Sequence, residues 1–99
     1  MKKLNIAYTC NVRQPWMEDE RYGEFEGPAT IAAVTAALER TGASVELIDV
    51  GPDIYYQLEK RKNQIDLVFN NTEGLDEKEL REAIVPFFCE HLHIPYTGS

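Results

Sequence analysis

The stretch that decides the fold is Ile65-Asp66-Leu67-Val68-Phe69-Asn70, the most continuous apolar run in the chain. A short run of this kind, bounded by polar segments, is typical of a strand inside a parallel sheet that helices cover on both faces. It therefore predicts the central strand of such a sheet. The polar stretch Asn71-Thr72-Glu73-Gly74 follows directly, so this prediction places it at the carboxyl end of the strand.

Strands and helices are expected to alternate along the rest of the chain. Apolar and polar residues alternate over residues 3–9 and 44–50, which predicts two more strands, and residues 94–96 predict a short closing strand. A first helix is expected over residues 28–41, with Pro28 in its first turn and Gly42 past its end. Its many alanines are expected to let it lie close against the sheet. A second, short helix is expected after the turn at residues 51–53.

A third helical stripe begins near Asp76 and continues to Leu92. Pro86 interrupts this stripe, so we expect either a kink or a fresh helix with Pro86 in its first turn. The resulting order of elements predicts a three-layer α/β domain, half of a Rossmann fold, with four parallel strands in the order 2-1-3-4. The pairs Tyr55-Tyr56 and Phe87-Phe88 are interpreted as residues of the core or its rim.

Composition and charge limit the class of function. The 99 residues suffice for one hydrophobic core, and 10 basic against 17 acidic side chains give a net charge of −7. This charge argues against nucleic-acid binding, which needs a basic surface. No apolar run approaches the roughly 20 residues of a membrane span, so no membrane partner is expected. The two cysteines, Cys10 and Cys89, are too few for a disulfide framework and fit a cytoplasmic location.

Candidate binding residues gather where the first and third strands are expected to end. The connections reverse direction between these strands, and in such sheets ligands bind beyond the carboxyl ends at that point. The loop over residues 10–26 carries Glu20, Glu24 and Glu26, which suit a cationic group such as an ammonium, and Glu73-Gly74 faces the same crevice. Two alternatives stay open. In the first, the loop glutamates only keep the loop solvated or interact favourably with the dipole of the next helix. In the second, Glu73 caps a helix and the neighbouring asparagines form Asx turns.

Other chemistries are not favoured. No glycine-rich phosphate loop follows the first strand, so nucleotide binding by this domain alone is not expected. The strand ends also lack the acidic residues of a phosphate-accepting receiver domain. Cys10 has no base near it in the sequence, since His91 and His93 lie late in the chain, so a buried free cysteine is expected. These histidines stand two residues apart, point to different sides of a helix, and predict no metal site.

Three stretches, in this order, resemble the N-terminal domain of D-alanine–D-alanine ligases and their ATP-grasp relatives. They are residues 47–53 (LIDVGPD), residues 66–70 (DLVFN) with Glu73-Gly74, and residues 94–99 (IPYTGS). The resemblance spans nearly the whole chain. It implies the pre-ATP-grasp fold, in agreement with the order of elements predicted above.

The resemblance also implies an activity. ATP-grasp ligases use ATP and Mg²⁺ to phosphorylate a carboxylate, which an amine then attacks. ATP and Mg²⁺ are implied to bind mainly to later domains, so residues 1–99 alone are expected to be inactive and to hold no catalytic residue. The N-terminal domain is implied to lend Glu73, Gly74, Ser99 and the first-loop glutamates to the pocket of an amine-bearing, amino-acid-like substrate. It is also implied to contact the remaining ATP-grasp domains and to form part of a homodimer interface.

The chain departs from the ligases at three places. They carry Glu-Arg-Glu-Val-Ser after the first strand, whereas an ungapped placement sets Gly23 at the first glutamate and leaves Glu20, Glu24 and Glu26 as candidates. Where the ligases read His-Gly, this chain has Glu73-Gly74, which argues against D-alanine itself as the substrate. His93 stands where relatives commonly have glycine, so a strained left-handed backbone is expected there.

The end of the chain and the acidic loop bear on the choice of function. Thr97-Gly98-Ser99 is typical of a loop that enters another element, so we expect a longer parent chain. The leading prediction is the substrate-side domain of an ATP-dependent carboxylate–amine ligase. The alternative is a non-catalytic α/β binding or assembly module whose acidic loop contacts a basic partner.

Overall fold

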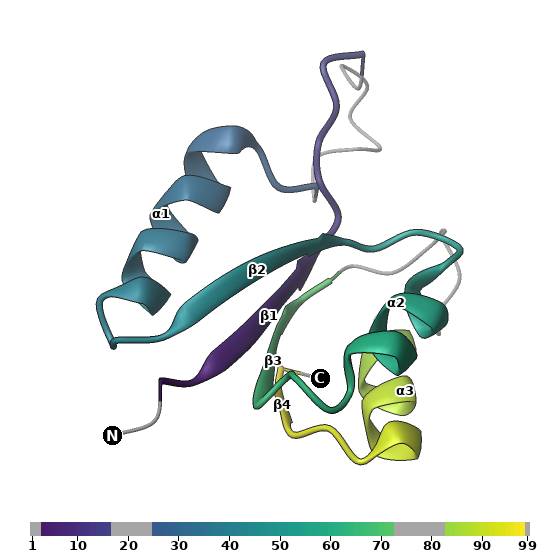
Figure 1. Ribbon diagram of the computed structural model, residues 1–99. Helices are drawn as coiled ribbons and strands as arrows, with labels where there is room; N and C mark the ends of the chain where they lie inside the picture. The colour runs from purple at the N-terminus through teal and green to yellow at the C-terminus, as the bar shows by residue number, and fades with distance from the viewer. Residues whose placement is uncertain (1–2, 17–24, 73–82, 99) are drawn as a thin grey trace.

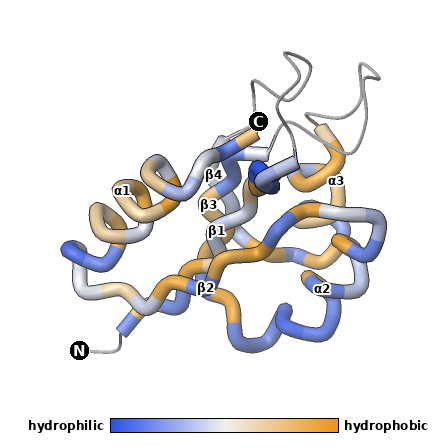
Figure 2. The backbone as a smooth tube through the Cα atoms, turned by 90° about the horizontal axis from the view of Figure 1, so that it is seen from above, coloured by the Kyte–Doolittle hydropathy of each residue, from blue (hydrophilic) through white to orange (hydrophobic). Residues whose placement is uncertain are grey.

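A four-stranded parallel sheet lies between two layers of helices in the computed structural model, which describes residues 3–16, 25–72 and 83–98 (Figure 1). The elements are, in chain order, β1 (Asn5–Cys10), α1 (Pro28–Glu39), β2 (Ser44–Asp49), α2 (Ile54–Arg61), β3 (Leu67–Asn71), α3 (Ile84–Leu92) and β4 (Tyr96–Thr97). The spatial order is β2-β1-β3-β4, with every pair parallel. Helix α1 covers one face, and α2 with α3 cover the other (Figures 1 and 2). The predicted fold class and strand order are confirmed.

The most deeply buried strand is β1. All of its residues from Ile6 to Cys10 are buried, whereas in β3 only Val68 is buried. Both strands lie inside the sheet, but α1 packs mainly against β2 and leaves the same face of β3 partly exposed. The prediction that residues 65–70 form an interior strand is therefore confirmed, and the prediction that helices cover it fully on both faces is wrong.

The hydrophobic core lies between the sheet and the pair α2–α3. Ile54 and Leu58 stand four residues apart on α2, so they share one face of the helix, and both are buried as that spacing predicts. This face meets the strand residues that point to the same side of the sheet. The core cluster comprises Ala7, Ile48, Val50, Ile54, Leu58, Val68, Val85, Cys89 and Ile94.

Helix α1 lies on the other face and contains no fully buried residue. It begins at Pro28, and Gly42 follows its end with φ +95°, as predicted. Ile31, Val34 and Leu38 are half-buried, while its alanines are exposed. The alanines fall on the arc opposite to these larger residues at 100° per residue, so the expectation that they bring the helix close to the sheet is wrong.

Helix α3 begins at Ile84 and so has Pro86 in its first turn, which is one of the two alternatives expected for that proline. It ends at His93, whose φ of 60° and ψ of 41° are left-handed. The predicted left-handed histidine is confirmed. The predicted helix start at Asp76 lies outside the described residues.

Strand β4 begins two residues later than expected, at Tyr96. It is followed by Gly98, which has φ +80°. A Cβ atom at Gly98 would lie 2.5 Å from the carbonyl oxygen of Asn70, so only glycine lets the chain pass this close to β3.

The aromatic pairs on α2 and α3 are only partly in the core. Phe88 packs against the core cluster, but Phe87 is 67% exposed, Tyr56 60% and Tyr55 38%. The interpretation of all four as core or core-rim residues is therefore wrong for Phe87 and Tyr56. Their positions on the outer sides of the two helices are the reason.

Candidate functional site at the carboxyl edge of the sheet

The switch between β1 and β3 brings the ends of three strands together. Cys10 pairs with Asp49 of β2 on one side and with Asn71 of β3 on the other. Side chains in register on neighbouring strands point to the same face of a sheet, so these three residues share the α1 face at its carboxyl edge. This is the edge where a parallel sheet of this order binds ligands.

The loop after β1 returns to this edge at Glu26. The backbone amide of Glu26 donates to the carbonyl of Asn11 over 2.7 Å, and the amide of Arg13 donates to the carbonyl of Glu26 over 2.7 Å. The amide of Val12 donates to Oδ1 of Asp49 over 3.1 Å. Two backbone bonds thus hold Glu26 beside the end of β1, and Asp49 holds the start of the loop.

The Glu26 carboxylate meets the Asn71 side chain, whose amide Nδ2 donates a hydrogen bond to Oε1. The contact joins residues 45 positions apart in the sequence. It orients one carboxylate oxygen toward β3, and Oε2 has lone pairs for a further donor. A carboxylate fixed in this way can accept a hydrogen bond from an ammonium with little further ordering.

Tyr8 and Cys10 lie under this edge and are fully buried. Burial raises the pKa of Tyr8 to about 12, and the Cys10 thiol, once ionised, and the Glu26 carboxylate add to the effect. Burial also raises the pKa of the Cys10 thiol to about 12, with Glu26 and Asp49 contributing in the same direction. Both groups are therefore protonated near neutral pH, and Cys10 is a buried, unreactive thiol as predicted.

The Tyr8 hydroxyl is close to Cys10 and Asn71 but has no hydrogen-bond partner of normal geometry among the described residues. The same holds for the buried hydroxyl of Thr72, directly after β3. Buried polar groups are usually paired with protein or water, because leaving one unpaired costs about 1–3 kcal/mol. The carboxyl edge therefore carries the unpaired hydroxyls of Tyr8 and Thr72 in addition to the carboxylates of Glu26 and Asp49.

Asn70 points to the opposite face and has a structural role. Its Oδ1 accepts from the Thr9 hydroxyl over 2.9 Å and from the backbone amide of Thr72 over 3.2 Å. The second bond spans two residues, which defines an Asx turn. The alternative interpretation of the asparagines as turn residues is thus confirmed for Asn70, while Asn71 belongs to the candidate site.

One of the six predicted site residues lies among the described ones, and it is at the site. Glu26 is half-buried beside Asn71. Glu20, Glu24, Glu73, Gly74 and Ser99 lie outside the described residues. The prediction missed Asn71, Asp49 and Tyr8. The period of two along the strands was the signal for Asn71 and Asp49, since both share a face with Cys10.

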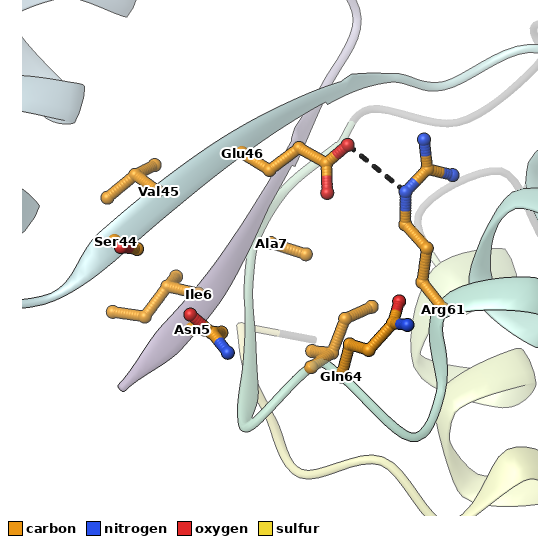
Figure 3. A pocket seen from close by; sticks show the side chains of 9 residues that line it. Asn5, Ile6, Ala7, Ser44, Val45, Glu46, Arg61 and Gln64 are labelled. Carbon is orange, nitrogen blue, oxygen red and sulfur yellow. Dashed lines mark hydrogen bonds and ion pairs between the residues drawn. The ribbon is translucent and has the colours of Figure 1, made fainter. Parts of the chain in front are cut away.

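A cavity of about 160 Å³ lies at the other end of the sheet (Figure 3). It is lined by the amino-terminal parts of β1 and β2, which include Asn5 and Ser44, by the end of α2, and by Gln64 in the turn that follows α2. Arg61 crosses its mouth to Glu46, with Nε 3.1 Å from Oε2, and also donates to Gln57. Its two charged side chains, Arg61 and Glu46, are paired with each other, and it lies at the opposite end of β1 and β2 from Cys10 and Asp49, so the carboxyl edge remains the candidate site.

In residues 3–16, 25–72 and 83–98, no three His, Cys, Asp or Glu side chains group in a way that would hold a metal ion. No helix in this part of the chain has both the length and the apolar character needed to cross a lipid bilayer.

Comparisons with known proteins identify no relative of this chain. No protein-family model matches the chain, and no match was found among curated proteins or among solved structures. The fold and the site together define the chain as a Rossmann-like α/β domain with acidic side chains at the carboxyl edge of its sheet.

Proposed function

We propose that the chain is the substrate-side N-terminal domain of an ATP-dependent carboxylate–amine ligase, and that its carboxyl edge binds the ammonium group of an amino-acid-like substrate. The observation that carries the proposal is the Glu26 carboxylate, bonded to Asn71 at the switch between β1 and β3. The resemblance of residues 47–53, residues 66–70 with Glu73-Gly74, and residues 94–99 to D-alanine–D-alanine ligases supports the reaction class.

The charges at this edge favour a cationic ligand. Glu26 and Asp49 raise the pKa of the nearby Cys10 thiol, which means that their negative field reaches the base of the site. A hydrogen bond between a carboxylate and an ammonium contributes about 1.5–3 kcal/mol. The same field would repel a phosphate group. We therefore assign the edge to the amine-bearing substrate and not to the nucleotide.

In the proposed parent, ATP would supply the phosphoryl group that activates the carboxylate substrate, and ATP and Mg²⁺ would be bound mainly by later domains. The described residues contain no metal-binding cluster, and no step is assigned to them beyond binding. Glu26 orients the amine, Asn71 orients Glu26, and the backbone bonds of Val12 and Arg13 keep the loop end in place.

Five further residues remain predictions of the same proposal. Glu73 and Gly74 follow Thr72 directly in the chain, and Ser99 follows Gly98. Glu20 and Glu24 precede Glu26 in the first loop. Any of the acidic residues among them would strengthen the preference for an ammonium.

An amine-dependent binding experiment tests the proposal. The 99-residue chain, labelled with ¹⁵N, is titrated by NMR with a panel of amino acids of both configurations and with propionate, which is alanine without its amine. We expect at least one amino acid to shift the amides of Val12, Glu26 and Asn71 with a dissociation constant in the millimolar range, and propionate to leave them unchanged. If no amino acid binds while trilysine shifts the same amides, the proposal fails and a module for a basic partner takes its place.

A further inference from the structure

The cavity at the amino-terminal end of the sheet, about 160 Å³ in volume, lies where helix α2 ends (Figure 3). Asn5 pairs with Ser44 in the register of β1 and β2, so both side chains point to the same face of the sheet. This is the face that α2 covers, because Ala7, two residues further along β1, belongs to the core cluster. Helix α2 ends at Arg61, and the chain turns over residues 62–64 before β3 begins. The cavity therefore lies between the strand ends and this turn.

Backbone hydrogen bonds hold the walls of this cavity in place. The amide of Gln64 donates to the carbonyl of Arg61 over 2.8 Å, which fixes the turn after α2. The amide of Asp66 donates to the carbonyl of Asn5 over 2.8 Å, and the amide of Asn5 donates to Oδ2 of Asp66 over 2.7 Å. These bonds tie the end of the turn to the start of β1. Because the walls are fixed before a ligand arrives, binding needs little ordering of the chain.

The lining combines an apolar base with polar side chains at the rim. Ala7 is 1% exposed, and Ile65 packs against the core cluster. The side chains of Asn5, Ser44 and Gln64 are exposed, and they make no hydrogen bond to another residue within the described part of the chain. A side-chain amide has donors next to an acceptor, and a hydroxyl can serve as either. The rim therefore offers hydrogen-bonding groups that a ligand can use.

The two charged groups at the cavity neutralise each other. Nε of Arg61 lies 3.1 Å from Oε2 of Glu46, and Nη1 of Arg61 donates to Gln57. A cationic ligand would have to compete with Arg61 for the Glu46 carboxylate. An anionic ligand would have to compete with Glu46 for Arg61, and it would also be repelled by a chain of net charge −7. The cavity therefore favours an uncharged ligand.

We propose that this cavity binds a small, uncharged molecule that carries a primary amide group. The N–H group and the carbonyl oxygen of an amide match the acceptor and the donors of Asn5 and Gln64, and the apolar part of the molecule lies on Ala7 and Ile65. The volume limits the ligand to about the size of one ring, since an engineered cavity of about 150 Å³ in another protein binds benzene. The cavity and the carboxyl edge lie at opposite ends of the sheet, so this proposal does not depend on the function proposed for that edge.

Titration of the ¹⁵N-labelled chain with benzamide, followed by NMR, tests the site. We expect the amides of Ala7, Glu46 and Gln64 to shift with a dissociation constant of about 1–10 mM. Benzoate and benzylammonium carry the same ring with a negative or a positive group, and each should bind to the cavity at least about fivefold more weakly. The proposal would be overturned if the three amides did not shift at about 50 mM benzamide, if the shifts were confined to Glu26 and Asn71, or if either charged probe bound the cavity equally well.

Two matched alanine variants locate the binding. Gln64→Ala removes an amide side chain from the rim, whereas Asn63→Ala removes one from the preceding residue of the same turn, which is exposed and lies outside the lining. Because both positions are exposed, both variants should keep the native fold, which circular dichroism checks. We expect Gln64→Ala to weaken the binding of benzamide about three- to tenfold and Asn63→Ala to change it less than about twofold. Equal effects of the two variants would contradict the proposed site.

Discussion

The buried Cys10 thiol makes the stability of the chain depend on pH in the alkaline range. In the unfolded chain the thiol ionises near its ordinary pKa of 9.0, whereas in the folded chain burial and the Glu26 and Asp49 carboxylates raise the pKa to about 12. Between these values the folded state holds a proton that the unfolded state has lost. The stability contributed by the neutral thiol is thus complete below pH 9 and is lost as the pH rises toward 12.

The size of the loss follows from the shift. One proton difference lowers the free energy of unfolding by about 1.4 kcal/mol per pH unit, so Cys10 alone removes up to about 4 kcal/mol between pH 9 and 12. Burial and Glu90 raise the pKa of Cys89 to about 11. Up to pH 11 this second thiol therefore lowers the free energy of unfolding by a further amount of about 1.4 kcal/mol per pH unit. This is a large part of the 5–15 kcal/mol typical of a whole domain.

Urea unfolding of Cys10→Ala, followed by circular dichroism in the presence of a reductant, isolates this contribution. At pH 7 the variant is expected to lose about 1 kcal/mol for the missing sulfur. Above pH 9 its free energy of unfolding should fall less steeply than that of the wild type, by about 1.4 kcal/mol per pH unit. Cys89→Ala should show the same difference only up to pH 11. Parallel curves for wild type and Cys10→Ala from pH 8 to 10.5 would refute the reasoning.

Three further predictions concern packing and nucleotide binding. Gly98→Ala places a methyl group 2.5 Å from the Asn70 carbonyl oxygen at positive φ and should lower the free energy of urea unfolding by about 1–3 kcal/mol. Gly27→Ala, where the added atom meets nothing within 4 Å, should cost no more than about 1 kcal/mol, and equal effects would contradict the role of Gly98. Leu58→Ala empties a fully buried position and should cost about 2–5 kcal/mol in the same assay; under 1 kcal/mol would contradict the assigned core. Calorimetry should detect no micromolar binding of Mg-ATP to residues 1–99, and such binding would contradict the assignment of nucleotide to other domains.

Local patterns in the sequence predicted most of the fold. The period of two in residues 44–50 and the four-residue spacing of Ile54 and Leu58 depend on near neighbours, and the structure confirms both elements. Pro28 and Gly42 mark the ends of α1 for reasons that are equally local. The strand order is one of the few that alternating strands and helices with right-handed crossovers allow, and the structure confirms it.

The arrangement of the site was less accessible to prediction because it depends on contacts between distant segments. The pairing of Val12 with Glu26 and the register of Cys10 with Asn71 together place Glu26 at the carboxyl edge. Neither pairing leaves a signal within one segment. The exposure of Phe87 was missed for a similar reason, since an apolar residue in a helix does not itself reveal which neighbours cover it.

The central claim is that Glu26 receives the ammonium group of a small molecule at the carboxyl edge. The most direct measurement is the dissociation constant of the best-bound amino acid for wild type, Glu26→Gln and Glu39→Gln, the last an exposed glutamate near the far end of α1. A charge-assisted hydrogen bond worth about 1.5–3 kcal/mol predicts a roughly ten- to hundredfold weaker affinity for Glu26→Gln and no change for Glu39→Gln. An affinity of Glu26→Gln within twofold of the wild type would contradict the claim.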